Sequence, residues 1–496
     1  MTHGMTHGKS DGMNGGTNGG KSIDDVLAEL RALRETDLPT HGGRTLAYVY
    51  DSGLAEVGEL GERAHALASS ANGLDPTAFP SLLRMENDLV ATAARLLGGD
   101  ERTVGSVTSG GTESCMLAVL AAREGAKQRT STPNIVLPST AHAAFRKAAH
   151  LFGLRAVHVA VDEKTFRADP AAMAAAIDDD TVLVVASAPS YAHGVVDPIP
   201  DIAAEAARRG VRMHVDACIG GWVLPYLRRL GDEVPPFDLA VEGVTSISVD
   251  LHKYAYCPKG ASVLLHADAR LRGGHYFASA DWPGYTMLNT TLQSTRSGGP
   301  LAAAWAVVRY LGDDGYLRLA RDTRTATERI RTGVDGVEGL RVLGSPDATL
   351  LAVTSEDGAD FDLFTVADEM ALRGWYVQPQ FGHGSSPVNL HLTITAANHG
   401  DEDGFLTDLA DAVAAARAAG PVVVAEEMRT LIGAIDADTL TAEQFEGLLQ
   451  AAGLDVAGGL PDRMAQVNAL LQAAPARLRE RVLLEFLGLL YRPHRG

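Results

Sequence analysis

Four short stretches of the sequence carry side chains that could do chemistry. In SVTSGGTES, residues 106–114, small and hydroxylated residues precede a helix that we expect to begin near Thr112. The free amides of a helix start, together with the hydroxyls of Ser109 and Thr112, form a ready phosphate site. An ordinary glycine-rich turn before a helix is the alternative interpretation, and this stretch alone leaves both open.

A histidine and an aspartate mark the next two stretches. His142 opens an expected helix in STAHAAFRKAAH, where its ring could pack on a flat cofactor or only satisfy the helix start. Asp216 ends an apolar run in HVDACIGGW. A carboxylate buried there needs a partner such as a protonated ring nitrogen, whereas an aspartate that caps a helix or lies at the surface needs none.

The fourth stretch, SISVDLHKYAYCPKGASVLL, places Lys253 beside His252 between two strand-like segments. A desolvated lysine has a lowered pKa and becomes a nucleophile toward carbonyl carbons. The alternative interpretation is an ordinary lysine whose ammonium reaches water and has no chemical role.

Taken together in chain order, these four features match the requirements of pyridoxal phosphate. The helix start would anchor the phosphate and the ring of His142 would stack on the cofactor. Asp216 would keep the pyridine nitrogen protonated, and Lys253 would bind the cofactor covalently. The combination therefore predicts a pyridoxal 5'-phosphate site, although each signal alone is weak.

The segments that must position these residues alternate between apolar strands and Ala-rich helices. Such alternation predicts an α/β fold with a largely parallel sheet that helices cover on both faces. In sheets of this kind, ligands bind at the carboxyl ends of the strands. The expected strands are residues 134–138, 155–160, 181–187, 211–216, 246–250 and 261–266.

Five segments are expected along the chain. A disordered, Gly-rich tail is followed by an N-terminal helical segment, a large cofactor-binding domain, a small α/β domain and a helical C-terminal extension. Their boundaries are 1–22, 23–105, 106–330, 331–420 and 421–496, and the extension has no counterpart that we can identify from the sequence.

Composition limits the possible partners. The 496 residues carry a formal charge of −19, which argues against a general nucleic-acid or anionic-membrane surface. No window of about 18 continuous apolar residues predicts a membrane span. The three cysteines, Cys115, Cys218 and Cys257, form no C-x-x-C pattern, so we expect neither a disulfide framework nor a metal site. This cysteine usage predicts that the protein resides in a reducing cytoplasm.

These motifs closely resemble the group II pyridoxal-phosphate-dependent decarboxylases, and especially their sphingosine-1-phosphate lyase branch. The resemblance runs from about Tyr48 to about Arg417 and includes TSGGTES, HVDACIGGW and HKYAYCPKGAS. It implies a fold-type I homodimer whose active sites are shared, with loop 291–299 contributed by the partner chain. It also implies cofactor-binding roles for Gly110, Gly111, Thr112, His142, Asp216, His252 and Lys253, and catalytic roles for Lys253 and His142.

The residues expected to meet the substrate give a mixed signal. Tyr50, in LAYVYDSG, resembles a catalytic tyrosine of the lyases, and Lys259 resembles a lysine that can meet a substrate phosphate. Asp75, in NGLDPTAFP, stands where the lyases have a phosphate-binding histidine, and it would repel a phosphate. Arg296 lies in STRSGG where GSRPGG is usual, and we treat it as a further substrate residue.

The resemblance leaves the reaction open between two possibilities. The first is carbon–carbon cleavage of a sphingosine-1-phosphate-like 2-amino-3-hydroxy phosphate ester to an aldehyde and phosphoethanolamine, by retro-aldol chemistry. The alternative is α-decarboxylation of an amino acid, which Asp75 would suit if the substrate carries no phosphate. An aminotransferase lacks support in the sequence, and a pseudoenzyme would not need Lys253, Asp216 and His142 together.

Overall fold

The computed structural model describes residues 20–451 and 463–493. The expected disordered tail, residues 1–22, lies almost entirely outside these ranges. The chain divides into two compact units, Met1–Pro39 and Thr40–Gly496. In the first unit, helix α1 (Ile23–Leu33) begins at Ser22, whose hydroxyl oxygen accepts a hydrogen bond from the Asp25 amide at 3.1 Å, as the N-cap pattern predicts.

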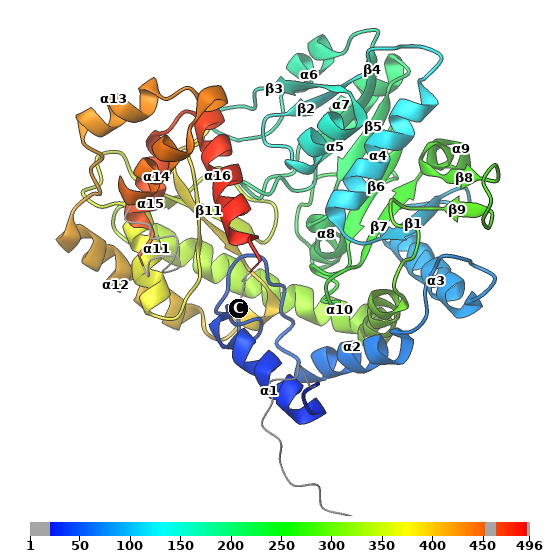
Figure 1. The fold of residues 1–496 in the computed structure, drawn as a ribbon, viewed down its shortest axis with the longest axis horizontal. Helices are drawn as coiled ribbons and strands as arrows, with labels where there is room; N and C mark the ends of the chain where they lie inside the picture. The colour runs from blue at the N-terminus through cyan, green and yellow to red at the C-terminus, as the bar shows by residue number, and fades with distance from the viewer. Residues whose placement is uncertain (1–19, 452–462, 494–496) are drawn as a thin grey trace, which may run out of the picture. The chain divides into compact units, whose positions relative to one another are not determined.

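The second unit is built around a large sheet whose described strands run in the order β1-β7-β6-β5-β4-β2-β3 (Figure 1). All pairings from β3 to β6 are parallel, and β7 pairs antiparallel with both β6 and β1. The predicted fold class, a mostly parallel α/β sheet flanked by helices, is confirmed. The strands are β1 (Val104–Thr108), β2 (Asn134–Pro138), β3 (Arg155–Val159), β4 (Thr181–Ser187), β5 (Arg212–Asp216), β6 (Ser246–Asp250) and β7 (Ser262–His266).

The strands are apolar on both faces because the sheet separates two cores. Leu183 and Val185 of β4 pack with helices α4 and α5, whereas Val184 and Ala186 pack in the core on the opposite face. This two-residue alternation between two buried faces explains the continuous apolar runs in the sequence. The helices around the sheet are α2 (Ala55–Ala68), α3 (Pro80–Leu96), α4 (Gly111–Gly125), α5 (Ala144–Phe152), α6 (Pro170–Ala176), α7 (Ile199–Arg208), α8 (Gly220–Arg229) and α9 (Ala269–Arg272).

A smaller antiparallel sheet follows the long helix α10 (Gly298–Asp335), with its described strands in the order β10-β11-β13-β12. It has its own apolar core, which includes Val353, Leu392 and Phe405. Its elements are β10 (Leu340–Val342), β11 (Leu350–Ser355), α11 (Leu363–Leu372), β12 (Gln378–Gln380), β13 (Asn389–Thr393) and α12 (Glu402–Ala419).

The described part of the C-terminal extension is helical, as predicted. Its helices pack around a separate apolar cluster that also takes in Phe364 of α11. Among the helices of residues 20–451 and 463–493, none is both long and apolar enough to cross a membrane. The helices of the extension are α13 (Glu426–Ala434), α14 (Ala442–Ala451), α15 (Ala465–Ala473) and α16 (Ala476–Leu490).

Four buried histidines make the folded protein sensitive to acid. Burial lowers the pKa of His193, His214 and His275 to about 4 and that of His391 to about 3. The unfolded chain takes up these protons near pH 6.5, so the stability that the neutral rings contribute is complete above pH 6.5. It falls as the pH drops from there toward 4, by up to about 3 kcal/mol for each ring. Burial raises the pKa of Asp197 to about 6, which offsets part of the loss.

We therefore expect the midpoint of thermal unfolding to fall steeply between pH 6.5 and 4. His275, neither of whose ring nitrogens has a hydrogen-bond partner among the described residues, is the best single test. His275→Gln should reduce the fall of the unfolding midpoint between pH 6.5 and 4. His150→Gln, at an exposed position, should leave that pH dependence unchanged. A profile of unchanged steepness in His275→Gln would contradict the assignment.

Candidate active site

A cavity of about 370 Å³ opens where the carboxyl ends of five strands meet. Strands β1, β2, β4, β5 and β6 run in the same direction, so the residues that follow them gather at one edge of the sheet. The cavity brings together all seven residues predicted to bind the cofactor: Gly110, Gly111, Thr112, His142, Asp216, His252 and Lys253.

The start of helix α4 forms one wall of this cavity. The Ser114 amide already donates to the Gly110 carbonyl, so the amides of Gly111 and Thr112 precede the first intrahelical bond. A β-carbon on Gly111 would lie 2.7 Å from an Asp250 carboxylate oxygen, which explains why this position has no side chain. Free amides facing a cavity at a helix N-terminus are suited to a phosphate.

Lys253 reaches the cavity from the turn after β6 and contacts a carboxylate that the sequence interpretation had not singled out. Its Nζ lies 3.0 Å from Oδ2 of Asp250, whose side chain is 2% exposed. Burial opposes the charge on Lys253, but the negative groups around it, Asp250 first, outweigh burial and raise its pKa well above its ordinary value. The pKa of Lys253 is therefore shifted opposite to the expected direction, because the negative groups together outweigh desolvation, although desolvation is the largest single effect.

Asp216 and His142 face the same cavity from the ends of β5 and β2. One carboxylate oxygen of Asp216, Oδ1, accepts a hydrogen bond from the Cys218 amide at 3.1 Å, which fixes the side chain. Nδ1 of His142 accepts from the Ala144 amide at 3.2 Å and so holds the ring at the start of α5. Both side chains are thus oriented by the backbone that follows them.

Tyr50 and Lys259 lie together beside Lys253. The Lys259 ammonium is 5.1 Å from the centre of the Tyr50 ring and donates to the Tyr48 carbonyl at 2.7 Å. Desolvation and the nearby charge of Lys253 lower the pKa of Lys259 to about 8. Burial raises the pKa of Tyr50, so its hydroxyl keeps its proton at neutral pH.

Asp75 and Arg296 do not line this cavity within their own chain. Asp75 is exposed, and hydrogen bonds from Thr77 to its carboxylate lower its pKa. Arg296 forms an ion pair with Glu86 at 2.6 Å and donates to the Val107 carbonyl at 2.7 Å. The substrate roles of both residues stay predictions.

The pyridoxal-dependent decarboxylase conserved domain matches residues 45–341, more than half of the chain. The chain belongs to this family. It is 38% identical to the sphingosine-1-phosphate lyase of Dictyostelium discoideum over 390 residues, which cover 79% of this chain and 72% of that protein. The family requires pyridoxal phosphate, so the protein is a pyridoxal-phosphate-dependent lyase, as predicted.

Solved structures agree with this family assignment. A sphingosine-1-phosphate lyase structure from Burkholderia pseudomallei has a TM-score of 0.76 and 37% identity, covering 82% of this chain and 94% of that one. A glutamate decarboxylase from Lactobacillus brevis has a TM-score of 0.71 at 20% identity, covering 84% and 97% of the two chains. The second likeness concerns the fold alone.

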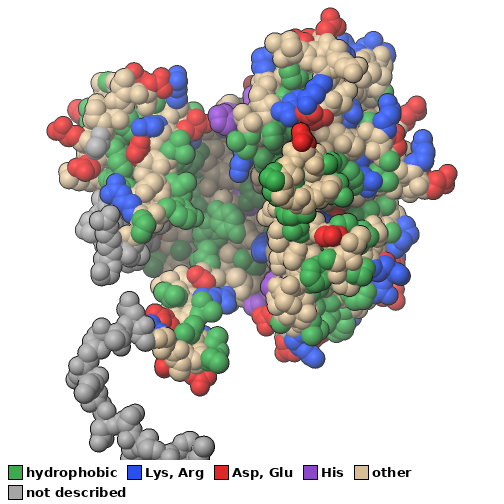
Figure 2. Space-filling model, turned by 45° about the vertical axis from the view of Figure 1, so that its right-hand side comes forward, with side chains coloured by type: hydrophobic (Ala, Val, Ile, Leu, Met, Phe, Trp, Pro, Cys, Tyr) green, Lys and Arg blue, Asp and Glu red, His purple; other side chains and the backbone are tan. Residues whose placement is uncertain are grey.

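The C-terminal extension also has a counterpart, which our sequence interpretation missed. Residues 426–489 match a C-terminal putative HTH domain of pyridoxal-dependent enzymes. This segment contains ten acidic and five basic residues. On the face of the molecule shown in Figure 2, basic and acidic side chains are interspersed.

The residues of the cavity fit the cofactor of this family. The backbone at Gly111 and Thr112 carries free amides that are suited to a phosphate. Lys253 supplies an amine within the same cavity. Asp250 Oδ1 and His252 Nδ1 are buried and have no hydrogen-bond partner among the described residues. Unpaired buried polar atoms are rare in native proteins and suggest that a bound group completes the site.

Asp250, Cys115 and Cys218 line the cavity but were not predicted to do so. Asp250 ends an apolar strand just as Asp216 does, so the same signal could have identified it. Cys115, Asp216 and Cys218 are buried, with ligand atoms within 4.8 Å of one another. This cluster could hold a metal ion, but it forms the wall of the cofactor cavity, and the expectation that the protein has no metal site stays a prediction.

Proposed function

We propose that this protein cleaves a sphingosine-1-phosphate-like 2-amino-3-hydroxy phosphate ester into an aldehyde and phosphoethanolamine. The observation that carries the proposal is the 37–38% identity to sphingosine-1-phosphate lyases across the whole cofactor-binding region. The pair of Tyr50 and Lys259 also supports it. The Lys259 ammonium and the Tyr50 hydroxyl lie close to Lys253, where both could donate hydrogen bonds to a substrate phosphate.

The bound cofactor supplies an electron sink for the carbon that carries the substrate nitrogen. The amides of Gly111 and Thr112 would hold its phosphate, and the carboxylate of Asp216 would accept a hydrogen bond from its protonated ring nitrogen. A base removes the proton of the 3-hydroxyl group, the bond between carbons 2 and 3 breaks, and carbon 3 leaves as the aldehyde. Carbon 2 then takes up a proton and the product is phosphoethanolamine.

The test is an assay of the purified, pyridoxal-loaded protein with two substrate sets. Sphingosine-1-phosphate and shorter amino-alcohol phosphates are followed by aldehyde release, and the common amino acids by carbon dioxide release. We expect aldehyde and phosphoethanolamine in equal amounts. Release of carbon dioxide without aldehyde would replace the proposal with the alternative, an amino acid α-decarboxylase.

Lys259 provides a prediction with a pH signature. Because its pKa is about 8, its charge is present below pH 8 and is lost as the pH rises through that value. The KM for a phosphate substrate should therefore rise between pH 7 and 9, where the phosphate itself stays dianionic. Lys259→Met should raise KM at pH 7 about tenfold or more with a smaller change in kcat.

The matched control is Lys259→Arg, which keeps its charge at every pH in this range. Its KM should be flat between pH 7 and 9. If KM rises equally in wild type and in Lys259→Arg, another group is responsible for the pH dependence.

We also propose that the protein is a cytoplasmic homodimer with shared active sites. In support, the β8–β9 hairpin (Phe277–Ser279 and Met287–Asn289) and its flanks expose large apolar side chains, as an interface would. These are Tyr276, Phe277, Trp282, Tyr285, Leu288 and Leu292. Sedimentation equilibrium of wild type and of Trp282→Asp would test the dimer.

The proposed cytoplasmic location has separate support. The cysteines are unpaired and buried, which suits a reducing compartment.

A further inference from the structure

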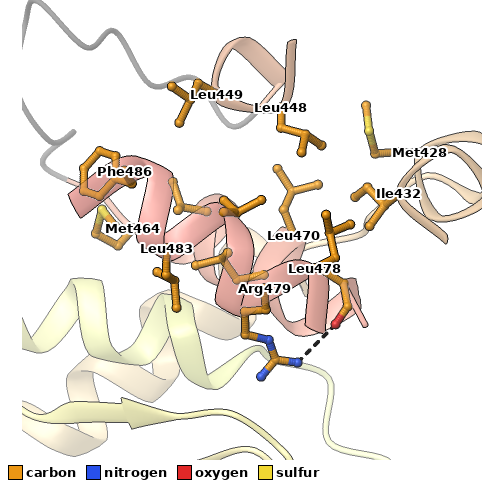
Figure 3. Close-up of a pocket in the computed structure, with 14 residues that line it drawn as sticks. Met428, Ile432, Leu448, Leu449, Met464, Leu470, Leu478, Arg479, Leu483 and Phe486 are labelled. Atoms are coloured by element: carbon orange, nitrogen blue, oxygen red, sulfur yellow. Dashed lines mark hydrogen bonds between the residues drawn. The ribbon is translucent and has the colours of Figure 1, made fainter. Parts of the chain in front are cut away.

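The C-terminal helices line a partly open apolar cavity that the lyase reaction does not use. It has a volume of about 200 Å³ and lies between α13, α14, α15 and α16 (Figure 3). Thirteen of the fourteen described residues that line it are apolar, among them Ile432, Leu448, Leu470 and Phe486. Arg479 is the exception.

An apolar cavity that stays unfilled is costly, even where it is partly open to solvent as here. Protein cores are packed as densely as organic crystals, and an unfilled apolar cavity destabilises a protein in proportion to its volume. A cavity of about 150 Å³ lined by Leu, Ile and Phe stays free of water and takes up small apolar molecules. The C-terminal cavity, with the same lining and a somewhat larger volume, has room for a single alkyl segment.

Arg479 adds a charge at the edge of this apolar space. Its Nη2 donates to the Ala474 carbonyl at 3.2 Å, and its guanidinium lies 4.7 Å from the centre of the Phe381 ring. Its Nε is buried and has no hydrogen-bond partner among the described residues. In Figure 3 its guanidinium points away from Leu448, Leu449 and Ile432, so the aliphatic stem lines the cavity and the charge lies beside it.

The neighbouring arginines of α16 have acidic partners. Arg477 forms an ion pair with Asp438 at 2.8 Å, and Arg481 forms one with Glu485 at 2.5 Å. Arg479 has no carboxylate partner within the described ranges, although it is less exposed than either neighbour. A partly buried guanidinium that has no carboxylate partner among residues 20–451 and 463–493, next to an apolar cavity, is complementary to an anionic group at the end of an apolar chain.

We propose that the C-terminal extension binds a single medium-length alkyl chain that carries an anionic head group, with the chain in the cavity and the head group at Arg479. Carboxylate and phosphate heads share this chemistry. The volume excludes two-chain lipids from the cavity itself, since ligand pockets for larger molecules are about 300–1,000 Å³. This site is separate from the active site and does not depend on the reaction proposed above.

The test is calorimetric titration of the full-length, pyridoxal-loaded protein with four probes below their micelle concentrations. The probes are decanoate, decyl phosphate, decanol and decyltrimethylammonium. We expect saturable binding of decanoate, decyl phosphate or both, with decanol weaker and the cation at least tenfold weaker. The two anionic probes distinguish a carboxylate ligand from a phosphate ligand.

Two pairs of variants locate the binding. Arg479→Gln should weaken the anionic probes at least tenfold and leave decanol unchanged, whereas Arg481→Gln should change neither. Leu483→Glu should abolish binding, whereas Leu487→Glu, on the same helix but outside the cavity lining, should not; these two leucines are 46% and 48% exposed. Binding of decyl phosphate at the active site would survive Leu483→Glu.

Thermal unfolding of each variant shows whether it is folded. If Leu483→Glu is unfolded, Arg479→Gln still decides the role of the cation. Absence of saturable binding by all four probes to the wild type would overturn the proposal. So would equal binding of the anions and the cation, or anion binding that Arg479→Gln leaves intact.

Discussion

Lys253→Ala should abolish covalent attachment of pyridoxal phosphate and lower turnover by at least about a thousandfold. Lys253 is the amine that the structure places inside the cofactor cavity, 3.0 Å from Asp250, whereas the ammonium of Lys259 is held by the Tyr48 carbonyl. The measurement is the absorbance spectrum of the cofactor-loaded protein, with mass spectrometry of the peptide labelled after borohydride reduction. Lys259→Ala should keep both the spectral band and the label on Lys253.

A persistent cofactor band in Lys253→Ala would show that another amine holds the cofactor. The single substitution also leaves Asp250 buried without its cation, which costs stability. The double variant Lys253→Ala/Asp250→Asn removes this unpaired charge. It should be more stable than the single variant and equally unable to bind the cofactor covalently.

Asp216→Ala should lower turnover by about two to four orders of magnitude and weaken cofactor binding. Its carboxylate is 8% exposed and is fixed through Oδ1 by the Cys218 amide, so it can accept from a protonated ring nitrogen at small entropic cost. A neutral ring nitrogen would withdraw electrons less effectively from the reacting carbon. Steady-state kinetics and the cofactor dissociation constant check this, with Asp216→Asn as the variant of equal size.

Exposed Asp313→Asn serves as the control and should retain wild-type kinetics. Near-normal turnover in Asp216→Ala would show that another carboxylate holds the ring nitrogen. Asp250 would then be the first candidate, because it is the other buried aspartate of the cavity.

The sequence predicts the large sheet well because its signal is local. Strands such as β4 and β6 begin and end as the apolar runs do, and the residues of β4 alternate between two buried cores. Placement of Gly111, Asp216 and Lys253 in one cavity follows from the shared direction of the strands. Parallel topology brings their carboxyl ends together regardless of how far apart they lie in the chain.

The parts that the sequence did not predict depend on contacts between distant segments. The raised pKa of Lys253 comes from the arrangement of carboxylates around it, which a general rule about burial does not contain. The ion pair between Arg296 and Glu86 joins residues that are 210 positions apart. The cavity in the C-terminal extension likewise depends on how the described helices α13, α14, α15 and α16 pack against one another, which helical periodicity alone does not show.

Helix α10 contributes to the cores of both sheets. Gly312, with φ +56°, interrupts it, and the first half packs in the core of the large sheet through Leu301, Ala304 and Val307. The second half supplies Ala326, Ile330 and Val334 to the core of the small sheet. Loss of either core would thus remove the support of a helix that the other core needs, and calorimetry should record one cooperative melting transition for both cores.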